Sequence, residues 1–92
     1  MIRTVRHKGL KRFIEHDDRS RLPAAMIERI RTILTALDDA DTLDEMNLSG
    51  FRLHPLKGDL RGFFAVTVRA NWRIIFRFED GGAYDIDLTD YH

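Results

Sequence analysis

The chain has 92 residues, of which 43% are hydrophobic and 33% charged, the composition of an ordinary globular protein. It contains no cysteine, which excludes disulfides, zinc–thiolate sites and thiol catalysis. The length predicts one domain over residues 1–92. Residues 1–11 mix charged with isolated apolar side chains, so we expect neither a secretory signal nor a membrane span. A cysteine-free domain of this kind fits the cytoplasm.

The net charge is zero because fifteen basic residues balance fifteen acidic ones, but the charges are grouped along the chain. Residues 1–31 hold nine basic and four acidic residues, and residues 51–78 hold six basic residues and one acidic residue. Residues 38–45 and 79–92 each hold five acidic residues and no Lys or Arg. The two basic segments either form one patch that binds a polyanion or only solvate the surface of a small domain.

The N-terminal half predicts a short strand followed by helices. Apolar residues at spacing i, i+3, i+4 predict a helix over residues 8–16. Pro23 suits the first position of a second helix, which an apolar stripe at helical period extends to about Asp39. A further helical turn is predicted at 42–46. The apolar residues of the first helix are Leu10, Phe13 and Ile14.

From Phe51 onward the hydrophobic pattern changes to period two, which predicts strands at residues 62–69, 72–78 and 84–89. The glycines within 79–83 favour a tight hairpin turn. The sequence therefore predicts an α+β fold, with two N-terminal helices packed on a small twisted antiparallel sheet.

Matching apolar faces also predicts the strand register. The pairs expected in the second hairpin are Phe78 with Tyr84, Phe76 with Ile86, Ile74 with Leu88, and Arg77 with Asp85. In the first hairpin Val68 would face Ile74, which sets Arg69 opposite Arg73. Two arginines in such positions repel each other, which a fold tolerates if an anion lies between them or if both extend into water.

The sequence also contains residue types that carry acid–base chemistry. The four histidines are His7, His16, His54 and His92, and no two have the helical i, i+4 spacing of metal ligands, so we expect no metal site and no organic cofactor. Cleavage of RNA without a metal needs a base for the 2′-hydroxyl, an acid for the leaving 5′-oxygen, and cations on the phosphate. Histidine, aspartate, lysine and arginine provide these groups, although each residue alone is typical of an ordinary surface.

Several stretches of the chain resemble HigB-type toxins of bacterial toxin–antitoxin modules, which belong to the RelE/ParE superfamily. They are residues 51–59 with the motif HPLKGD, residues 71–78 with NWRI, and residues 83–92, which end in DYH. Residues 7–11 follow the same pattern, so the resemblance covers nearly the whole chain. It implies a RelE-like fold and an endoribonuclease that enters the A site of a translating ribosome and cleaves mRNA there.

The resemblance also implies the catalytic residues. The matching positions are His54, Lys57, Arg73, Asp90, Tyr91 and His92. Arg69 is added as an RNA-binding residue because of the predicted register and its closeness to an arginine of the family. His54 is expected to support the phosphate or the pocket.

The other roles are assigned by hypothesis from the same resemblance. Lys57 and Arg73 hold the scissile phosphate and stabilise its developing charge. His92 and Asp90 divide the two proton transfers, with the base and the acid left unassigned. Tyr91 positions a base of the codon or stacks on it.

Further basic residues are candidates for contacts with ribosomal RNA, because phosphate binding gives affinity without sequence choice. They are Lys8, Lys11, Arg12, Arg19 and Arg21. The implied partners are a helix-turn-helix antitoxin (HigA-like), the small ribosomal subunit with its mRNA, and operator DNA only through the antitoxin. The neutral net charge departs from the usually basic ribonucleases of the superfamily, which points to weak activity or to strong reliance on the ribosome.

Two other functions fit the same scaffold. One is inhibition of gyrase, as in the ParE branch, and the other is a non-catalytic role as co-repressor with the antitoxin. The complete set of Lys57, Arg73 and the terminal DYH argues against inhibition of gyrase, because an inhibitor that does not cleave RNA needs no proton donor and acceptor there.

Overall fold

The computed structural model describes residues 1–90, so Tyr91 and His92 lie outside the described part of the chain. The helical elements are α1 (Lys8–His16), α2 (Ile27–Asp39) and the short 3₁₀ turns η1 (Ala24–Met26), η2 (Leu43–Met46) and η3 (Gly58–Leu60). The strands β1 (His54–Pro55), β2 (Phe64–Arg69), β3 (Trp72–Glu79) and β4 (Gly82–Asp90) form one antiparallel sheet in the order β1-β2-β3-β4. The predicted fold class is confirmed.

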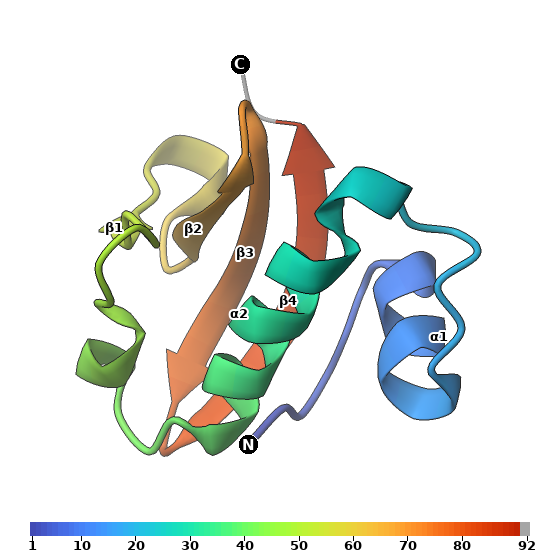
Figure 1. Ribbon diagram of the computed structural model, residues 1–92. Helices are drawn as coiled ribbons and strands as arrows, with labels where there is room; N and C mark the ends of the chain where they lie inside the picture. Colours follow the sequence, from blue (N-terminus) through green and yellow to red (C-terminus); the bar gives the residue numbers. More distant parts are fainter. Residues whose placement is uncertain (91–92) are drawn as a thin grey trace.

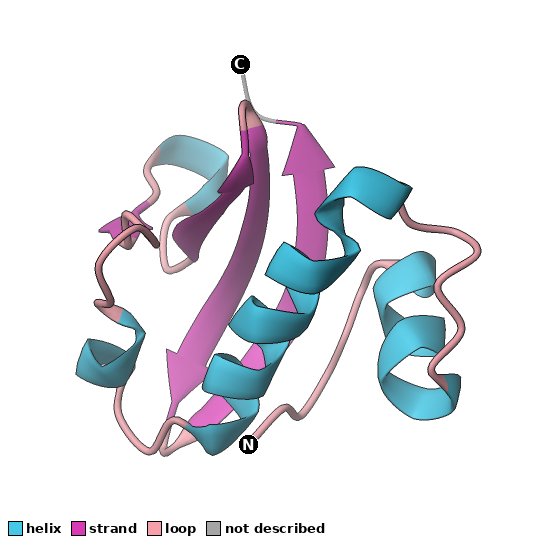
Figure 2. Cartoon of the chain, in the orientation of Figure 1, coloured by secondary structure: helices cyan, strands magenta, loops and turns pink. Residues whose placement is uncertain are grey.

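The helices lie on one face of the sheet, with α2 directly across it and α1 beyond α2 (Figures 1 and 2). This face carries the main core, in which Ile30, Ile33 and Leu37 of α2 and Phe76 of β3 are fully buried. The opposite face of the sheet, which we call the outer face, is not covered by either long helix. The helix-facing side therefore provides most of the packing, and part of the outer face is covered by residues of the segment between β1 and β2.

The first helix begins and ends at residues with clear local signals. The Nδ1 atom of His7 accepts a hydrogen bond from the backbone N–H of Leu10 at 3.1 Å, and Asp17 ends the helix in the left-handed conformation with φ 54°. The sequence places Ile14 on the apolar side of α1, but this residue is 38% exposed. Ile14 is exposed because it lines a groove of about 480 Å³ between the N-terminal segment and α1.

The N-terminal segment runs parallel to β4 but forms only two isolated bridges, Ile2 with Ala83 and Val5 with Ile86. The backbone N–H of Ile2 also donates to the carboxylate of Asp38 at the end of α2, at 3.0 Å. The expected leading strand is therefore a bridged segment that joins β4 to α2. Within residues 1–90, no helix has the length and apolar character needed to cross a membrane.

The register differs from the prediction in both hairpins. Ile74 pairs with Leu88 as expected, but it faces Val66 across β2, and the predicted partner Val68 lies at a bulge between Thr67 and Arg69. A bulge adds one residue to a strand without a partner and shifts all later pairs.

A second irregularity lies between Ile75 and Arg77. Opposite it Asp85 has φ 54°, and the extra residue makes Phe78 pair with Ala83 in place of the predicted Tyr84. Strands β2, β3 and β4 were predicted to within two residues of their bounds and β1 was not predicted. The pairing was shifted because bulges do not change the hydrophobic pattern.

Candidate active site

The outer face carries a row of polar residues across three strands. Thr67 of β2 pairs with Arg73 of β3, which pairs with Thr89 of β4. Arg73 is half-buried, and no described acidic side chain forms an ion pair with it. The sheet therefore presents a guanidinium that is held among neutral neighbours, and such a cation is suited to bind a phosphate.

The segment between β1 and β2 folds over the outer face beside this row. Leu56 and Phe63 are buried against Ala65 and Ile75, and Leu60 packs against the same cluster. Two backbone hydrogen bonds close the segment, from Leu56 N–H to the Phe63 carbonyl at 2.9 Å and from Phe63 N–H to the Leu60 carbonyl at 2.9 Å. This second apolar cluster was not predicted from the sequence, and it fixes the loop that contains Lys57.

Lys57 lies immediately before η3 and is exposed. In Figure 1, η3 lies in the upper part of the view, where β4 and the β2–β3 turn also end. The Lys57 loop packs through Leu56 and Phe63 on Ile75, which lies on the same face of β3 as Arg73. That Lys57 and Arg73 bind one phosphate together stays a prediction.

The guanidinium of Arg73 is folded back onto the β2–β3 turn. Its Nη1 donates to the carbonyl of Ala70 at 2.6 Å and to that of Trp72 at 3.1 Å. Ala70 has φ 51°, a left-handed conformation that a non-glycine residue seldom adopts. The turn therefore supplies a carbonyl that holds one end of Arg73.

A neighbouring arginine of the outer face is neutralised. Arg77 donates to Glu79 at 2.6 Å and to Asp85 at 3.1 Å, and these contacts, with Glu79 the larger, raise the pKa of Arg77. Arg6 lies 3.7 Å from Asp85 and stacks 5.3 Å from the centre of the Phe63 ring. The predicted pairing of Arg77 with Asp85 is wrong, because the cross-strand partner of Arg77 is Tyr84, but the two side chains form an ion pair.

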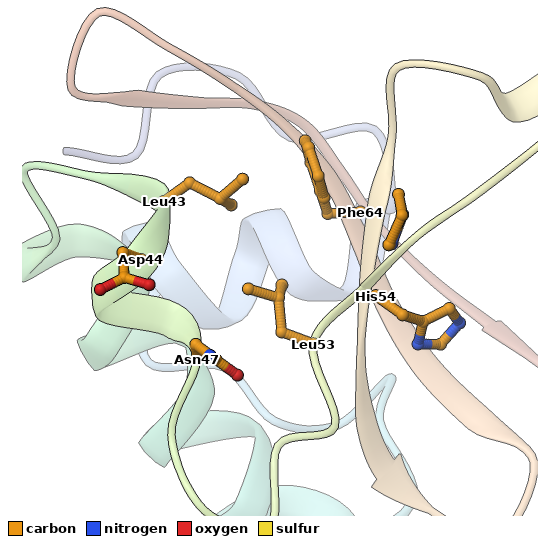
Figure 3. A pocket seen from close by; sticks show the side chains of 7 residues that line it. Leu43, Asp44, Asn47, Leu53, His54 and Phe64 are labelled. Carbon is orange, nitrogen blue, oxygen red and sulfur yellow. The ribbon is translucent and has the colours of Figure 1, made fainter.

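His54 is exposed and pairs with Ala65, which places it on the outer-face side of β1. Its Nδ1 lies 3.0 Å from the carbonyl oxygen of Arg52. Figure 3 shows a neighbouring pocket of about 300 Å³, from which the His54 ring points away, with Leu43, Asp44 and Asn47 on the other side. His54 is therefore oriented toward the outer face, and the pocket belongs to the helix-facing side.

Arg69 does not take the predicted position. It is exposed and pairs with Trp72, which in turn pairs with Asp90, while Arg73 faces Thr67. The bulge at Val68 separates the two arginines, so the predicted pairing of Arg69 with Arg73 is wrong. Asp90 is exposed at the end of β4, and the catalytic residues expected at 91 and 92 fall outside the described residues.

The basic residues of α1 lie away from this region, because α1 is beyond α2 in Figure 1. Lys8 and Lys11 are exposed, and Arg12 is engaged with Asp18 at 2.8 Å. Hydrogen bonds from Ser20, followed by the one from Arg12, hold the pKa of Asp18 well below its usual value. The basic residues of α1 therefore do not form one patch with Arg73, whereas Arg6 of the same basic segment contacts Asp85 and the Phe63 ring.

The sequence analysis missed Arg29, which connects α2 to the edge of the site. Its Nη2 donates to the Gly50 carbonyl at 2.7 Å and to the Thr67 carbonyl at 3.1 Å, while its guanidinium lies 4.9 Å from the centre of the Phe51 ring. The signal in the sequence was a basic residue inside an otherwise apolar helical stripe. Within the described residues, no group of three His, Asp or Glu side chains is arranged to hold a metal ion.

Comparisons with known proteins agree with this architecture. A family model described as "RelE-like toxin of type II toxin-antitoxin system HigB" matches residues 3–92. The protein named "Endoribonuclease HigB" from Proteus vulgaris is 47% identical over 92 residues, which cover all of both chains.

Solved structures show the same fold at low sequence identity. YafQ from E. coli strain BL21(DE3) has a TM-score of 0.66 at 16% identity, covering 98% of this chain and 91% of that chain. A chain in the YoeB–YefM complex from Staphylococcus aureus has a TM-score of 0.60 at 15% identity, covering 100% and 95%. By the family match and the full-length relative, the chain belongs to the HigB-like family of RelE-like toxins of type II toxin–antitoxin systems.

Proposed function

We propose that this chain, acting as one toxin domain over residues 1–92, is a ribosome-dependent endoribonuclease that cleaves mRNA in the A site. The observation that carries the proposal is the 47% identity, over its full length, to a protein named as an endoribonuclease. The outer face supports it, because Arg73 has no ion pair with a described acidic residue and the Lys57 loop is packed beside the sheet. Translation takes place in the cytoplasm, which is the proposed location.

The proposed chemistry is cleavage by the 2′-hydroxyl without a metal. Lys57 and Arg73 hold the scissile phosphate and stabilise the charge that develops on it. His92 and Asp90 divide the proton transfers, and Tyr91 stacks on a base of the codon. The upstream fragment then ends in a 2′,3′-cyclic phosphate or a 3′-phosphate.

The neutral net charge supports dependence on the ribosome. Arg77 is neutralised by two carboxylates, and Asp87 lies on the same face as Arg73, so the field of the site alone is reduced. The ribosome would supply the binding energy that the isolated chain lacks. In this proposal Lys8 and Lys11 contact ribosomal RNA on another side of the toxin, while Arg12 is already paired with Asp18.

The proposed partner is a helix-turn-helix antitoxin that neutralises the toxin and links it to operator DNA. The similarity of the fold to a chain of the YoeB–YefM complex from Staphylococcus aureus supports such a partner. Binding of operator DNA by the toxin alone is not expected, because its basic groups are dispersed over separate surfaces.

The function is tested by inducing the wild-type chain and His92→Ala in bacterial cells and mapping the 5′ ends of mRNA. We expect the wild type to cut messages in register with the reading frame and the variant to make no such cuts. If His92→Ala cleaves as well as the wild type, the assignment of His92 is wrong. Growth arrest by the wild type without any mRNA cleavage would favour inhibition of gyrase, which a supercoiling assay then measures.

A further inference from the structure

Two buried polar atoms on the outer face lack a hydrogen-bond partner. Among the described residues they are the Thr67 hydroxyl oxygen and Arg73 Nε, the two buried side-chain nitrogen or oxygen atoms in this state. Their residues are direct partners across β2 and β3. Buried polar atoms are normally paired, because burial removes their hydrogen bonds to water. A donor and an acceptor left unpaired at opposing positions indicate that the site has a second arrangement in which they pair.

Thr67 is well placed to act as a fixed acceptor. Its backbone N–H donates to the Phe51 carbonyl at 2.7 Å, and its own carbonyl accepts from Arg29 Nε at 3.3 Å and Nη2 at 3.1 Å. The backbone of Thr67 is thus held by the carbonyl of Phe51 and by Arg29 of α2. Within residues 1–90, by contrast, the hydrogen bonds of the Arg73 side chain are those of Nη1 to two carbonyls of the neighbouring turn. The arginine side chain is therefore the part of this pair that can move.

We infer that Thr67 is a positioning residue for Arg73, whose Nε donates to the Thr67 hydroxyl when RNA is bound. Directly opposed residues have Cβ atoms about 5 Å apart, so rotation about the bonds of the Arg73 side chain brings Nε within reach of the hydroxyl. With Nε held in this way, both Nη nitrogens face outward as a fork that matches two oxygens of a phosphate. The inference rests on the proposed function, in which Arg73 binds the scissile phosphate.

The chain offers a matched control on the other side of Arg73. Thr89 is the partner of Arg73 across β4, and its hydroxyl is not one of the buried unpaired atoms. Thr→Val at either position removes one hydroxyl and keeps the branched shape that strands favour. Thr67→Ser keeps the hydroxyl and removes only a methyl group. Any effect of strand packing alone appears in Thr89→Val and in Thr67→Ser.

The test is single-turnover cleavage of mRNA on programmed ribosomes by the full chain. We expect Thr67→Val to slow cleavage about tenfold, as for one lost hydrogen bond to a charged group. Thr67→Ser and Thr89→Val should stay within about twofold of the wild type. In the Arg73→Ala background, Thr67→Val should cause no further loss, because the hydroxyl acts through Arg73. Full activity of Thr67→Val, or the same loss with and without Arg73, would overturn the inference.

Folding is checked by urea unfolding, and Thr67→Ala provides a second variant without the hydroxyl. It must reproduce the loss seen in Thr67→Val, and a wild-type rate in Thr67→Ala contradicts the inference. A readout that does not depend on cleavage is the NMR signal of the Arg73 Nε–H group, recorded while a short RNA oligonucleotide is added. We expect its exchange with water to slow in the wild type and in Thr67→Ser but not in Thr67→Val.

The two measurements separate the inference from the proposed function. If the wild type cleaves no mRNA on ribosomes but the Arg73 signal behaves as expected, the proposed function fails and the pairing of Thr67 with Arg73 stands. If cleavage is normal and the signal does not respond to RNA in any variant, the pairing is wrong and the proposed function stands.

Discussion

Arg77 and Asp85 form an ion pair at 3.1 Å across the irregularity between β3 and β4, although they are not backbone partners. Asp85 reaches Arg77 because it is an extra residue in the strand, with φ 54°. The contact neutralises one cation of the outer face and leaves Arg73 as the arginine there without a described acidic partner. The electrostatic field of the site is therefore set by a bulge.

Asp85→Asn should strengthen RNA binding. Asparagine accepts positive φ at least as readily as aspartate, so the bulge is retained while Arg77 and Arg6 lose a negative neighbour. We expect the affinity for a short RNA to rise about two- to fivefold at low salt, and the gain to shrink as salt screens the added charge. Fluorescence anisotropy measures it. Asp39→Asn, which removes the same charge at the end of α2, is the control, and an equal gain there would refute a local effect.

Phe63→Ala should destabilise the protein and weaken cleavage together. The Phe63 ring is 8% exposed, packs in the second apolar cluster and lies beneath Arg6. We expect a loss of about 2–4 kcal/mol in the free energy of unfolding, because a large side chain is removed from a packed site. Urea denaturation measures the loss.

The effect of Phe63→Ala on activity is assayed at a temperature where the variant remains folded. We expect slower cleavage, since the cluster holds the loop of Lys57 against the sheet. Leu48→Ala is the control, because Leu48 is 48% exposed and its truncation should leave both properties unchanged. Unimpaired cleavage by folded Phe63→Ala would show that the loop needs no such support.

Arg29→Met should remove the hydrogen bonds that join α2 to β2 at the edge of the site, and the protein should become less stable. Methionine keeps the length and apolar stem of arginine but cannot donate to the Gly50 and Thr67 carbonyls or stack as a cation on Phe51. We expect the free energy of unfolding to fall by about 1–3 kcal/mol, as measured by urea denaturation. Arg29→Lys should recover part of the loss, because a lysine reaches one carbonyl as a single charge. Equal loss in both variants would contradict a role for the forked guanidinium.

Glu45 should contribute stability that disappears in acid. Its carboxylate accepts from the N–H groups of Thr42 at 2.8 Å and Asp41 at 2.7 Å, and these bonds, with Thr42 first, lower the pKa of Glu45 from its ordinary 4.5. A lowered pKa in the folded state stabilises the protein above the unfolded pKa, and this contribution is lost as the pH falls through the folded pKa.

The corresponding measurement compares the thermal midpoint of the wild type and Glu45→Gln between pH 7 and pH 3. We expect the wild type to be more stable at neutral pH and the difference to shrink in acid, where Glu45 becomes protonated and resembles glutamine. Glu15→Gln, on the exposed side of α1, controls for a general effect of charge. A difference that is constant with pH would mean that the Glu45 charge has no role in this turn.

The sequence by itself determined where the helices and strands lie and which residue types are available for catalysis. The stripe of α2 and the alternation in β3 report which side of each element is apolar, and this property is local. The dipeptide Asp80-Gly81 similarly favours the second hairpin, because both residues of this turn have positive φ. The family resemblance rested on such local motifs, and the comparisons confirm it.

The tertiary structure alone decided the pairing of the strands and therefore the neighbours of Arg73. The bulges at Val68 and Asp85 add a residue to one strand without changing its apolar pattern, so matching faces gave the wrong partner for Arg69. Likewise Arg29 and the cluster around Phe63 join residues that are far apart in the chain. Such contacts depend on the packing of several elements at once, and for that reason the periodicity of a single segment contains no record of them.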